Sequence, residues 1–218
     1  MRQRDYVRSL PAAVRYYGCP AEEGGAGKTF MVAAGLFRDV GIAITWHPSC
    51  ITQIIRGSSL ASSRIDFTFH GRSFHAASLH LGRSTLDAGS IKAAYEFVGC
   101  TKSEDKALYD VLLPEDHSPK SLAASTDVGD VSWCVPTVQI WGANYAIGTP
   151  FHTWQMVAQG KSRLAYRGMF HAAKVMAMTA KEAFCDPDLV REAMAELVQR
   201  VGTGYTTLLP ADARPGFD

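Results

Sequence analysis

The hydrophobic positions of the first 50 residues alternate between short apolar runs and a helical stripe. Runs rich in β-branched and aromatic residues predict strands at 12–17 and 41–46. Between them, apolar side chains recur at helical spacing from Phe30 to Phe37 and predict a helix over 27–37. Strand, helix and strand in this order predict a βαβ unit with two parallel strands. The turns after both strands would then lie at the edge of the sheet where α/β proteins bind ligands.

The rest of the pattern divides into a small insert and a helical second half. Residues 64–70 alternate apolar and polar, as in a half-buried antiparallel strand, and 85–98 follow with helical spacing. We therefore interpret 50–102 as an α+β insert. Beyond it, the pattern predicts a helix at 103–113, a strand at 135–141 and helices at 164–184 and 187–201.

Composition and charge exclude several classes of protein. Hydrophobic residues make up 47% and charged residues 20% of the 218 positions, enough for a buried core and too apolar for wholesale disorder. The 22 basic and 21 acidic residues nearly cancel, so nothing indicates a nucleic-acid-binding surface. No apolar run reaches the roughly 18 residues of a membrane span, and no secretory signal is visible. The five scattered cysteines form no Cys-x-x-Cys pair, which favours a reducing, cytoplasmic location over a disulfide framework.

Two adjacent carboxylates, Glu22 and Glu23, follow the first predicted strand in a turn loosened by glycines. Neighbouring side chains in an extended turn point in different directions, so one can bind a metal while the other faces a metal-bound water. His47 ends the second predicted strand before a proline, and His152 lies in a later turn. Taken alone, the acidic pair is more often a solvated turn than a site, and a lone histidine is more often an ordinary core or surface residue than a metal ligand.

One motif is rejected as a site. Residues 24–29 read Gly-Gly-Ala-Gly-Lys-Thr and resemble the end of a phosphate-binding P-loop. The motif requires glycine at position 22, where this chain has Glu22. A pair of carboxylates would also repel the phosphates that such a loop binds. Nucleotide binding through Lys28 is therefore the weakest functional hypothesis.

Taken together, the segments resemble the M20 family of metal-dependent amidohydrolases and peptidases, and within it the branch of p-aminobenzoyl-glutamate hydrolases and N-acyl-amino-acid hydrolases. The resemblance covers most of 12–95 and 105–185, in the order of the family. The stretches that carry it include Glu-Glu-Gly-Gly at 22–25, Thr-Trp-His-Pro at 45–48, His-Leu-Gly-Arg-Ser at 80–84, Ser-Thr-Asp-Val-Gly-Asp at 125–130 and Gly-Thr-Pro-Phe-His-Thr-Trp at 148–154.

The resemblance implies a role for each matched residue. Glu22 would be the general base that takes a proton from metal-bound water, and His75, on the lid, would help to stabilise the oxyanion. The metal ligands would be Glu23, His47 and His152, with Asp127, Asp130 and Arg83 in supporting positions. The cofactor would be Mn²⁺ or Zn²⁺, with up to two ions in relatives. The substrates would be N-acyl or p-aminobenzoyl amino acids, cleaved at the amide bond.

The implied fold is an α/β catalytic core, a mixed sheet flanked by helices, with a small and incomplete α+β lid. We expect the core to comprise 1–49 and 103–218 and the partial lid and dimerisation domain to comprise 50–102. Relatives carry a Cys-Gly-His-Asp segment upstream of the Glu-Glu turn and a long stretch between Ser84 and Ser125, and this chain has neither. We therefore expect a shortened, internally deleted chain that is a poor hydrolase and marginally stable alone.

A second hypothesis follows from these differences. The chain would be a non-catalytic subunit or interaction module that pairs with a related amidohydrolase subunit through the lid. The resemblance implies a homodimer or such a heterodimer, with no nucleic-acid or membrane partner.

Overall fold

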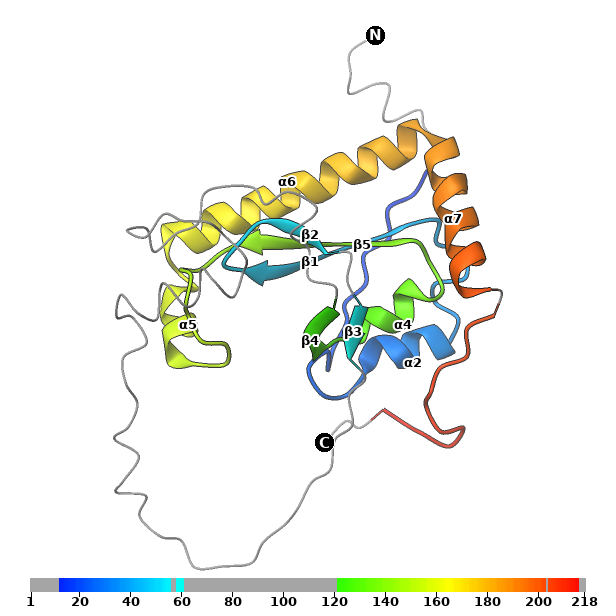
Figure 1. Cartoon of the computed structure of the whole chain (residues 1–218), viewed down its shortest axis with the longest axis horizontal. Coiled ribbons are helices and arrows are strands. Elements are labelled where there is room, and N and C mark those ends of the chain that lie inside the picture. The colour runs from blue at the N-terminus through cyan, green and yellow to red at the C-terminus, as the bar shows by residue number, and fades with distance from the viewer. Residues whose placement is uncertain (1–11, 56–57, 61–120, 203, 216–218) are drawn as a thin grey trace, which may run out of the picture.

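The computed structural model describes a mixed α/β protein with a small mixed sheet and flanking helices (Figure 1). The residues described are 12–55, 58–60, 121–202 and 204–215. The predicted elements at 64–70, 85–98 and 103–113 lie outside these ranges, as do His75 and Arg83. The division into a core and a lid therefore stays a prediction.

The main sheet has the strand order β1-β5-β2, with β1 (Ala43–Ser49) parallel to β5 (Thr137–Ala143) and β2 (Gln53–Ile55) antiparallel to it. Among the described strands β1 lies at the edge of the sheet, where Pro48 is tolerated although proline has no N–H to donate. A second, two-stranded parallel sheet pairs β3 (Ser58–Leu60) with β4 (Ser121–Ser125).

The predicted strand at 12–17, and with it the βαβ unit, is wrong. Residues 12–20 form no strand, and Tyr16 is 91% exposed. β1 pairs instead with β5, which lies more than 90 residues along the chain. Residues 12–20 are fixed by side chains: Arg15 forms a two-pronged ion pair with Asp39, and the Tyr17 hydroxyl donates to the carbonyl of Leu36 at 2.7 Å.

Helices lie on both sides of the main sheet. α6 (Arg163–Cys185) runs along one face, and α7 (Pro187–Val201) follows it after a sharp bend (Figure 1). On the other side lie α2 (Gly27–Ala33) and α4 (Val128–Ser132), which contact each other. α5 (Trp154–Gln159) stands at the C-terminal end of β1 and β5 (Figure 1).

The sequence pattern predicted the bounds of the long helices α6 and α7 well and those of the shorter helix α2 less well. α6 and α7 match the predicted ranges closely: Asp186 caps α7 by accepting from the backbone of Asp188 and Leu189 at 3.1 Å. α2 is shorter than predicted, because the chain turns after Ala33 and Gly35 adopts a left-handed conformation with φ of 76°.

A small core lies between α2, α4 and the start of the sheet. It is built on Phe37, Val131 and Val135, and Ala43 of β1 packs against it. This contact shows that the face of β1 that carries the Ala43 side chain is the one directed towards α2 and α4. Among the described helices, none has the length and apolar character needed to cross a bilayer.

Candidate active site

Polar contacts gather on the α2 and α4 side of the sheet, around the turn at 21–26 that precedes α2. Glu22 accepts a hydrogen bond from the Thr126 hydroxyl at 2.7 Å, across 104 residues of sequence. Thr126 stands directly before α4, so this bond fixes the Glu22 carboxylate against the start of that helix. Two residues of the turn, Ala21 and Ala26, have positive φ values of 57° and 51°, so the turn is tightly bent.

Glu23 points to a different neighbour. Its carboxylate lies 3.5 Å from Nδ1 of His152, and both side chains are about 70% exposed. His152 itself has a φ of 56°, a conformation that L-residues adopt rarely. The structure thus brings together two side chains that lie far apart in the chain and that the sequence predicts as metal ligands.

His47, the third predicted ligand, lies in β1, where its Nδ1 is 2.7 Å from the carbonyl oxygen of Pro48. Within the described residues, no three His, Cys, Asp or Glu side chains stand close enough together to hold one metal ion. The arrangement therefore joins Glu23 to His152 without adding His47 to them. The role of His47 as a ligand stays a prediction.

Asp127, which is only 7% exposed, joins α2 to α4 through an ion pair. One carboxylate oxygen accepts from the backbone N–H of Lys28 at 2.8 Å and the other from its ammonium at 2.7 Å. Only 12% of the Lys28 side chain and 4% of that of Asp127 are exposed. Because a buried carboxylate holds the Lys28 ammonium, this lysine is not presented to a phosphate group, which agrees with the rejection of a P-loop.

Asp130 completes the network. Its carboxylate accepts from the hydroxyl of Thr29 at 2.8 Å and from the hydroxyl of Tyr205. The Tyr205 ring also stacks on Trp133, with centroids 6.1 Å apart. The segment after α7 is thereby attached to α4 at two points.

Burial and these carboxylates set the pKa values of nearby groups. The pKa of Tyr205 is raised, first by burial and then by the hydrogen bond to Asp130. Burial raises the pKa of the Cys19 thiol, and the charge of Lys28 partly offsets this. Burial also raises the pKa of Cys134, with a further contribution from Asp130. Each of these groups is held in its neutral form.

Sequence reasoning missed three members of this network. Thr126 lies within a stretch that resembles the M20 family, yet nothing in a hydroxyl next to Asp127 marks it as a partner of Glu22. Tyr205 lies 75 residues from Asp130 and follows the last helix, where no local pattern points to a contact. For Lys28, the local motif suggests only a phosphate ligand and gives no sign of a buried carboxylate partner.

The comparison with known proteins finds a similar protein that is named as a hydrolase subunit. The chain is 28% identical to a p-aminobenzoyl-glutamate hydrolase subunit of Escherichia coli strain K12, over 340 residues that include 93% of this chain and 71% of the relative. The matched region is longer than the 218 residues of this chain, so parts of it have no counterpart here. No family model and no solved structure matches the chain. The similarity supports an amidohydrolase-like relationship.

Proposed function

We propose that this protein is an amidohydrolase that cleaves the amide bond of p-aminobenzoyl-glutamate or of related N-acyl amino acids. One observation carries the proposal: two adjacent carboxylates have different partners. Glu22 is bound to Thr126, and Glu23 lies beside His152. The similarity to a hydrolase subunit over nearly the whole chain supports the substrate class.

Glu22 is the proposed proton carrier. The Thr126 hydroxyl engages Oε1 of its carboxylate, which fixes the group while leaving Oε2 available to take a proton from water and to pass it to the leaving amine. Glu22 is partly buried and Glu23 is exposed, so the two carboxylates occupy different surroundings although they are neighbours in sequence.

Glu23 and His152 would hold a divalent metal, Mn²⁺ or Zn²⁺, with His47 as the proposed third ligand. Carboxylate and imidazole together suit both ions, and the pair at 3.5 Å supplies two of the donors. The described residues do not bring a third donor to this pair. When bound, such an ion would polarise the amide carbonyl and lower the pKa of a coordinated water.

The remaining residues have supporting roles in the proposal. Asp127 and Asp130 fix α2 against α4 and so position the turn that carries Glu22. His75 would stabilise the oxyanion and Arg83 would support it, both from a lid at 50–102. The catalytic domain would comprise 1–49 and 103–218.

Hydrolysis of p-aminobenzoyl-glutamate, with Mn²⁺ or Zn²⁺ added, tests this function. Glu22→Gln keeps the size and the acceptor for Thr126 but cannot carry the proton, so kcat is expected to fall about 100-fold or more. Glu192→Gln is the matched control, because it makes the same chemical change on the exposed surface of α7. Activity that survives Glu22→Gln contradicts the assigned mechanism.

Metal binding by calorimetry separates the roles of the two carboxylates. Glu23→Gln is expected to weaken Mn²⁺ binding at least tenfold, whereas Glu22→Gln is expected to bind Mn²⁺ as the parent does. Equal weakening by both substitutions would show that their roles are not divided as proposed.

A second candidate function is that of a non-catalytic subunit. It is favoured by the ligand pair that lacks a third member in the described residues, and by the name of the relative, which is that of one subunit of a hydrolase. The chain would bind a related full-length hydrolase subunit through its lid. Recovery of the tagged protein from its host with such a subunit at constant stoichiometry supports this function. Recovery of the chain by itself, together with metal-dependent hydrolysis that Glu22→Gln abolishes, excludes it.

A further inference from the structure

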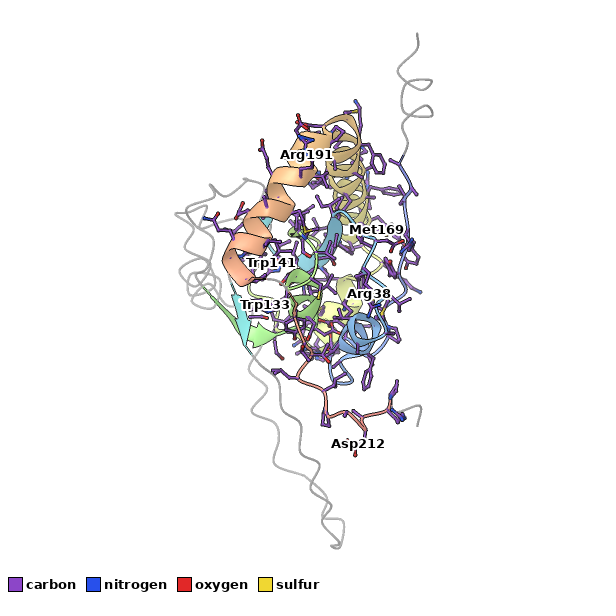
Figure 2. All side chains as sticks on the ribbon, turned by 90° about the vertical axis from the view of Figure 1, so that its right-hand side faces the viewer. Arg38, Trp133, Trp141, Met169, Arg191 and Asp212 are labelled. Atoms are coloured by element: carbon purple, nitrogen blue, oxygen red, sulfur yellow. The ribbon has the colours of Figure 1, made fainter. Side chains whose placement is uncertain are left out.

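The chain leaves α7 at Gly202, where a φ of 75° ends the helix, and the described residues 204–215 form neither helix nor strand. Figure 2 labels Trp133 at the end of α4, where this segment is attached, and Asp212 further along the segment, away from that helix. Among the described residues of the segment, Tyr205 is the one whose side chain hydrogen-bonds to another element. The attachment of the segment therefore depends on Tyr205.

The carboxylate of Asp130 joins three parts of the molecule. It belongs to α4, and its Oδ2 accepts from the hydroxyl of Thr29 in α2 at 2.8 Å. Its Oδ1 accepts from the hydroxyl of Tyr205. The two oxygens of a carboxylate are held in one plane, so an orientation fixed by one donor also fixes the oxygen that meets the other donor. The bond from Tyr205 thus helps to aim the bond from Thr29.

Tyr205 is well suited to this task because both ends of its side chain are held. Its ring stacks on Trp133, with centroids 6.1 Å apart and planes at 14°, and its hydroxyl donates to Asp130. The pKa of the hydroxyl is raised, first by burial and then by that hydrogen bond, so the proton stays in place near neutral pH. Asp130 therefore has a donor that does not titrate away under ordinary conditions.

The start of α2 and the turn before it are packed too closely to move separately. Gly27 begins the helix, and a Cβ there would stand 2.1 Å from the carbonyl oxygen of Pro20. Within the turn, the N–H of Gly25 donates to the carbonyl of Ala21 at 2.9 Å. Because close-packed backbone transmits a displacement instead of absorbing it, a shift of α2 moves the turn and carries Glu22 with it.

The other partner of Glu22 is fixed to α4. Thr126 stands directly before that helix, and its hydroxyl donates to Glu22 at 2.7 Å. Glu22 therefore follows α2 through its backbone, whereas its carboxylate is bound from α4. Its geometry depends on how α2 is seated against α4, and the bond from Thr29 to Asp130 is one of the contacts that set this seat.

We propose that Tyr205 is a positioning residue for the hydrolysis proposed above, on which this inference rests. Its hydroxyl acts through Asp130 and Thr29 to hold α2 against α4, and with them it holds the carboxylate of Glu22 in line with the water and the amide. The segment after α7 is in this way a strap that fixes the turn at 21–26 from the C-terminal end of the chain.

Tyr205→Phe tests the proposal because it keeps the stacked ring and removes only the hydroxyl. For p-aminobenzoyl-glutamate with Mn²⁺ added, kcat is expected to fall about fivefold while KM stays within about twofold, since Glu22 carries a proton and does not bind the substrate. The loss is limited because the buried ion pair between α2 and α4 remains. Tyr166→Phe is the matched control: it makes the same change on an exposed tyrosine of α6 and should leave both constants unchanged.

A double variant tests the route of the effect. Thr29→Val keeps the shape of the side chain and removes the other donor to Asp130, so its kcat should also fall about fivefold. If both hydroxyls act through Asp130, combining Thr29→Val with Tyr205→Phe should cost little more than either change alone. Independent effects would multiply to about 25-fold.

The thiol of Cys19 reports on the turn without any need for activity. Cys19 directly precedes Pro20, and burial raises its pKa, so it should react slowly with iodoacetamide. Tyr205→Phe is expected to speed alkylation of Cys19 at least about threefold, because the turn becomes less firmly held. Mass spectrometry of the peptides resolves this site from Cys185, which is exposed at the end of α6 and should react at the same rate in both proteins.

The two readouts separate this inference from the proposed function. A parent that does not hydrolyse the substrate contradicts the function, and the alkylation of Cys19 then decides on the positioning. Unchanged alkylation of Cys19 in a Tyr205→Phe variant whose far-ultraviolet circular dichroism matches the parent overturns the proposal. In an active parent it is also overturned by an unchanged kcat, or by effects of Thr29→Val and Tyr205→Phe that multiply.

Discussion

The two faces of the main sheet differ in whether their buried polar groups are hydrogen-bonded. On the α2 and α4 face, Asp127 and Asp130 accept from donors on α2 and on the C-terminal segment, and Lys28 is paired. On the α6 face, the Trp46 N–H and the Asn144 carbonyl are buried without partners among the described residues. The first face pairs its charged groups, whereas the second leaves a donor and an acceptor unpaired among the described residues.

This difference separates a face whose polar groups fix its geometry from a face whose polar groups do not. Polar groups that satisfy one another fix the geometry of nearby residues, and here they hold the turn that carries Glu22. Buried polar groups without partners lower stability instead, because they have lost water without gaining another hydrogen bond. The comparison fails if the hydrogen-bonded groups of the α2 and α4 face contribute little to stability.

The largest expected effect comes from the ion pair between Lys28 and Asp127. Asp127→Asn leaves the ammonium buried without its counter-charge, and the free energy of unfolding is expected to fall by about 3 kcal/mol. Urea unfolding measures the change. Asp39→Asn is the control, because it breaks an exposed pair with Arg15 and should lower the free energy of unfolding by less than about 1 kcal/mol.

A double substitution sharpens this test. Lys28→Met combined with Asp127→Leu removes both charges, and its stability should lie closer to that of the parent than to that of Asp127→Asn. If Asp127→Asn unfolds at the same urea concentration as the parent, the paired face is not the structural support described above.

The next effect concerns how closely α6 approaches the main sheet. A Cβ at Gly168 would lie 2.3 Å from the carbonyl oxygen of Ala143 and 2.8 Å from Cγ of Asn144. Gly168→Ala is therefore expected to lower the free energy of unfolding by about 1–2 kcal/mol, after the gain in helix propensity is counted.

Ala173→Gly on the exposed surface of α6 measures the contribution of helix propensity separately, and it should lower the free energy of unfolding by about 1 kcal/mol. A Gly168→Ala variant that is more stable than the parent would show that α6 has room to shift away from the sheet.

The elements of this fold were predictable where the signal is local. α7 begins at a proline, is capped by Asp186 and ends at Gly202, so its bounds Pro187–Val201 could be read from the sequence. The strand predicted at 12–17 does not form. Residue composition shows only that a segment suits a sheet, and it does not identify a second strand with which the segment would pair. The pairing of β1 with β5 depends on residues far apart in the chain, which local patterns do not encode.

The candidate site shows the same division. The approach of Glu23 to His152 was predicted only through the resemblance to a family, since neither residue alone favours a site over a surface position. No pattern in the sequence predicted the hydrogen bonds of Thr126 and Tyr205, because a hydroxyl can find its acceptor anywhere in the fold. The unpaired Trp46 and Asn144 could be recognised only once their neighbours were known.

The smallest expected effect comes from a single hydrogen bond on the α2 and α4 face, the bond from Tyr205 to Asp130. Tyr205→Phe removes the hydroxyl that donates to Asp130 and keeps the ring that stacks on Trp133, so the free energy of unfolding should fall by about 1 kcal/mol near neutral pH. Tyr205→Leu, which also removes the stacking, should cost more. Chemical unfolding of the three proteins gives both differences.

The pH dependence of this difference tests its cause. An unfolded tyrosine ionises near pH 10, whereas the pKa of Tyr205 is raised in the folded protein, first by burial and then by the bond to Asp130. Above about pH 10 the folded state therefore holds a proton that the unfolded state has released, and stability falls as the pH rises. Tyr205→Phe lacks this proton, so the stability gap between parent and variant should narrow above about pH 10. A gap that stays constant to about pH 11 would mean that the hydroxyl does not depend on Asp130, and that the paired face is less completely satisfied than its geometry indicates.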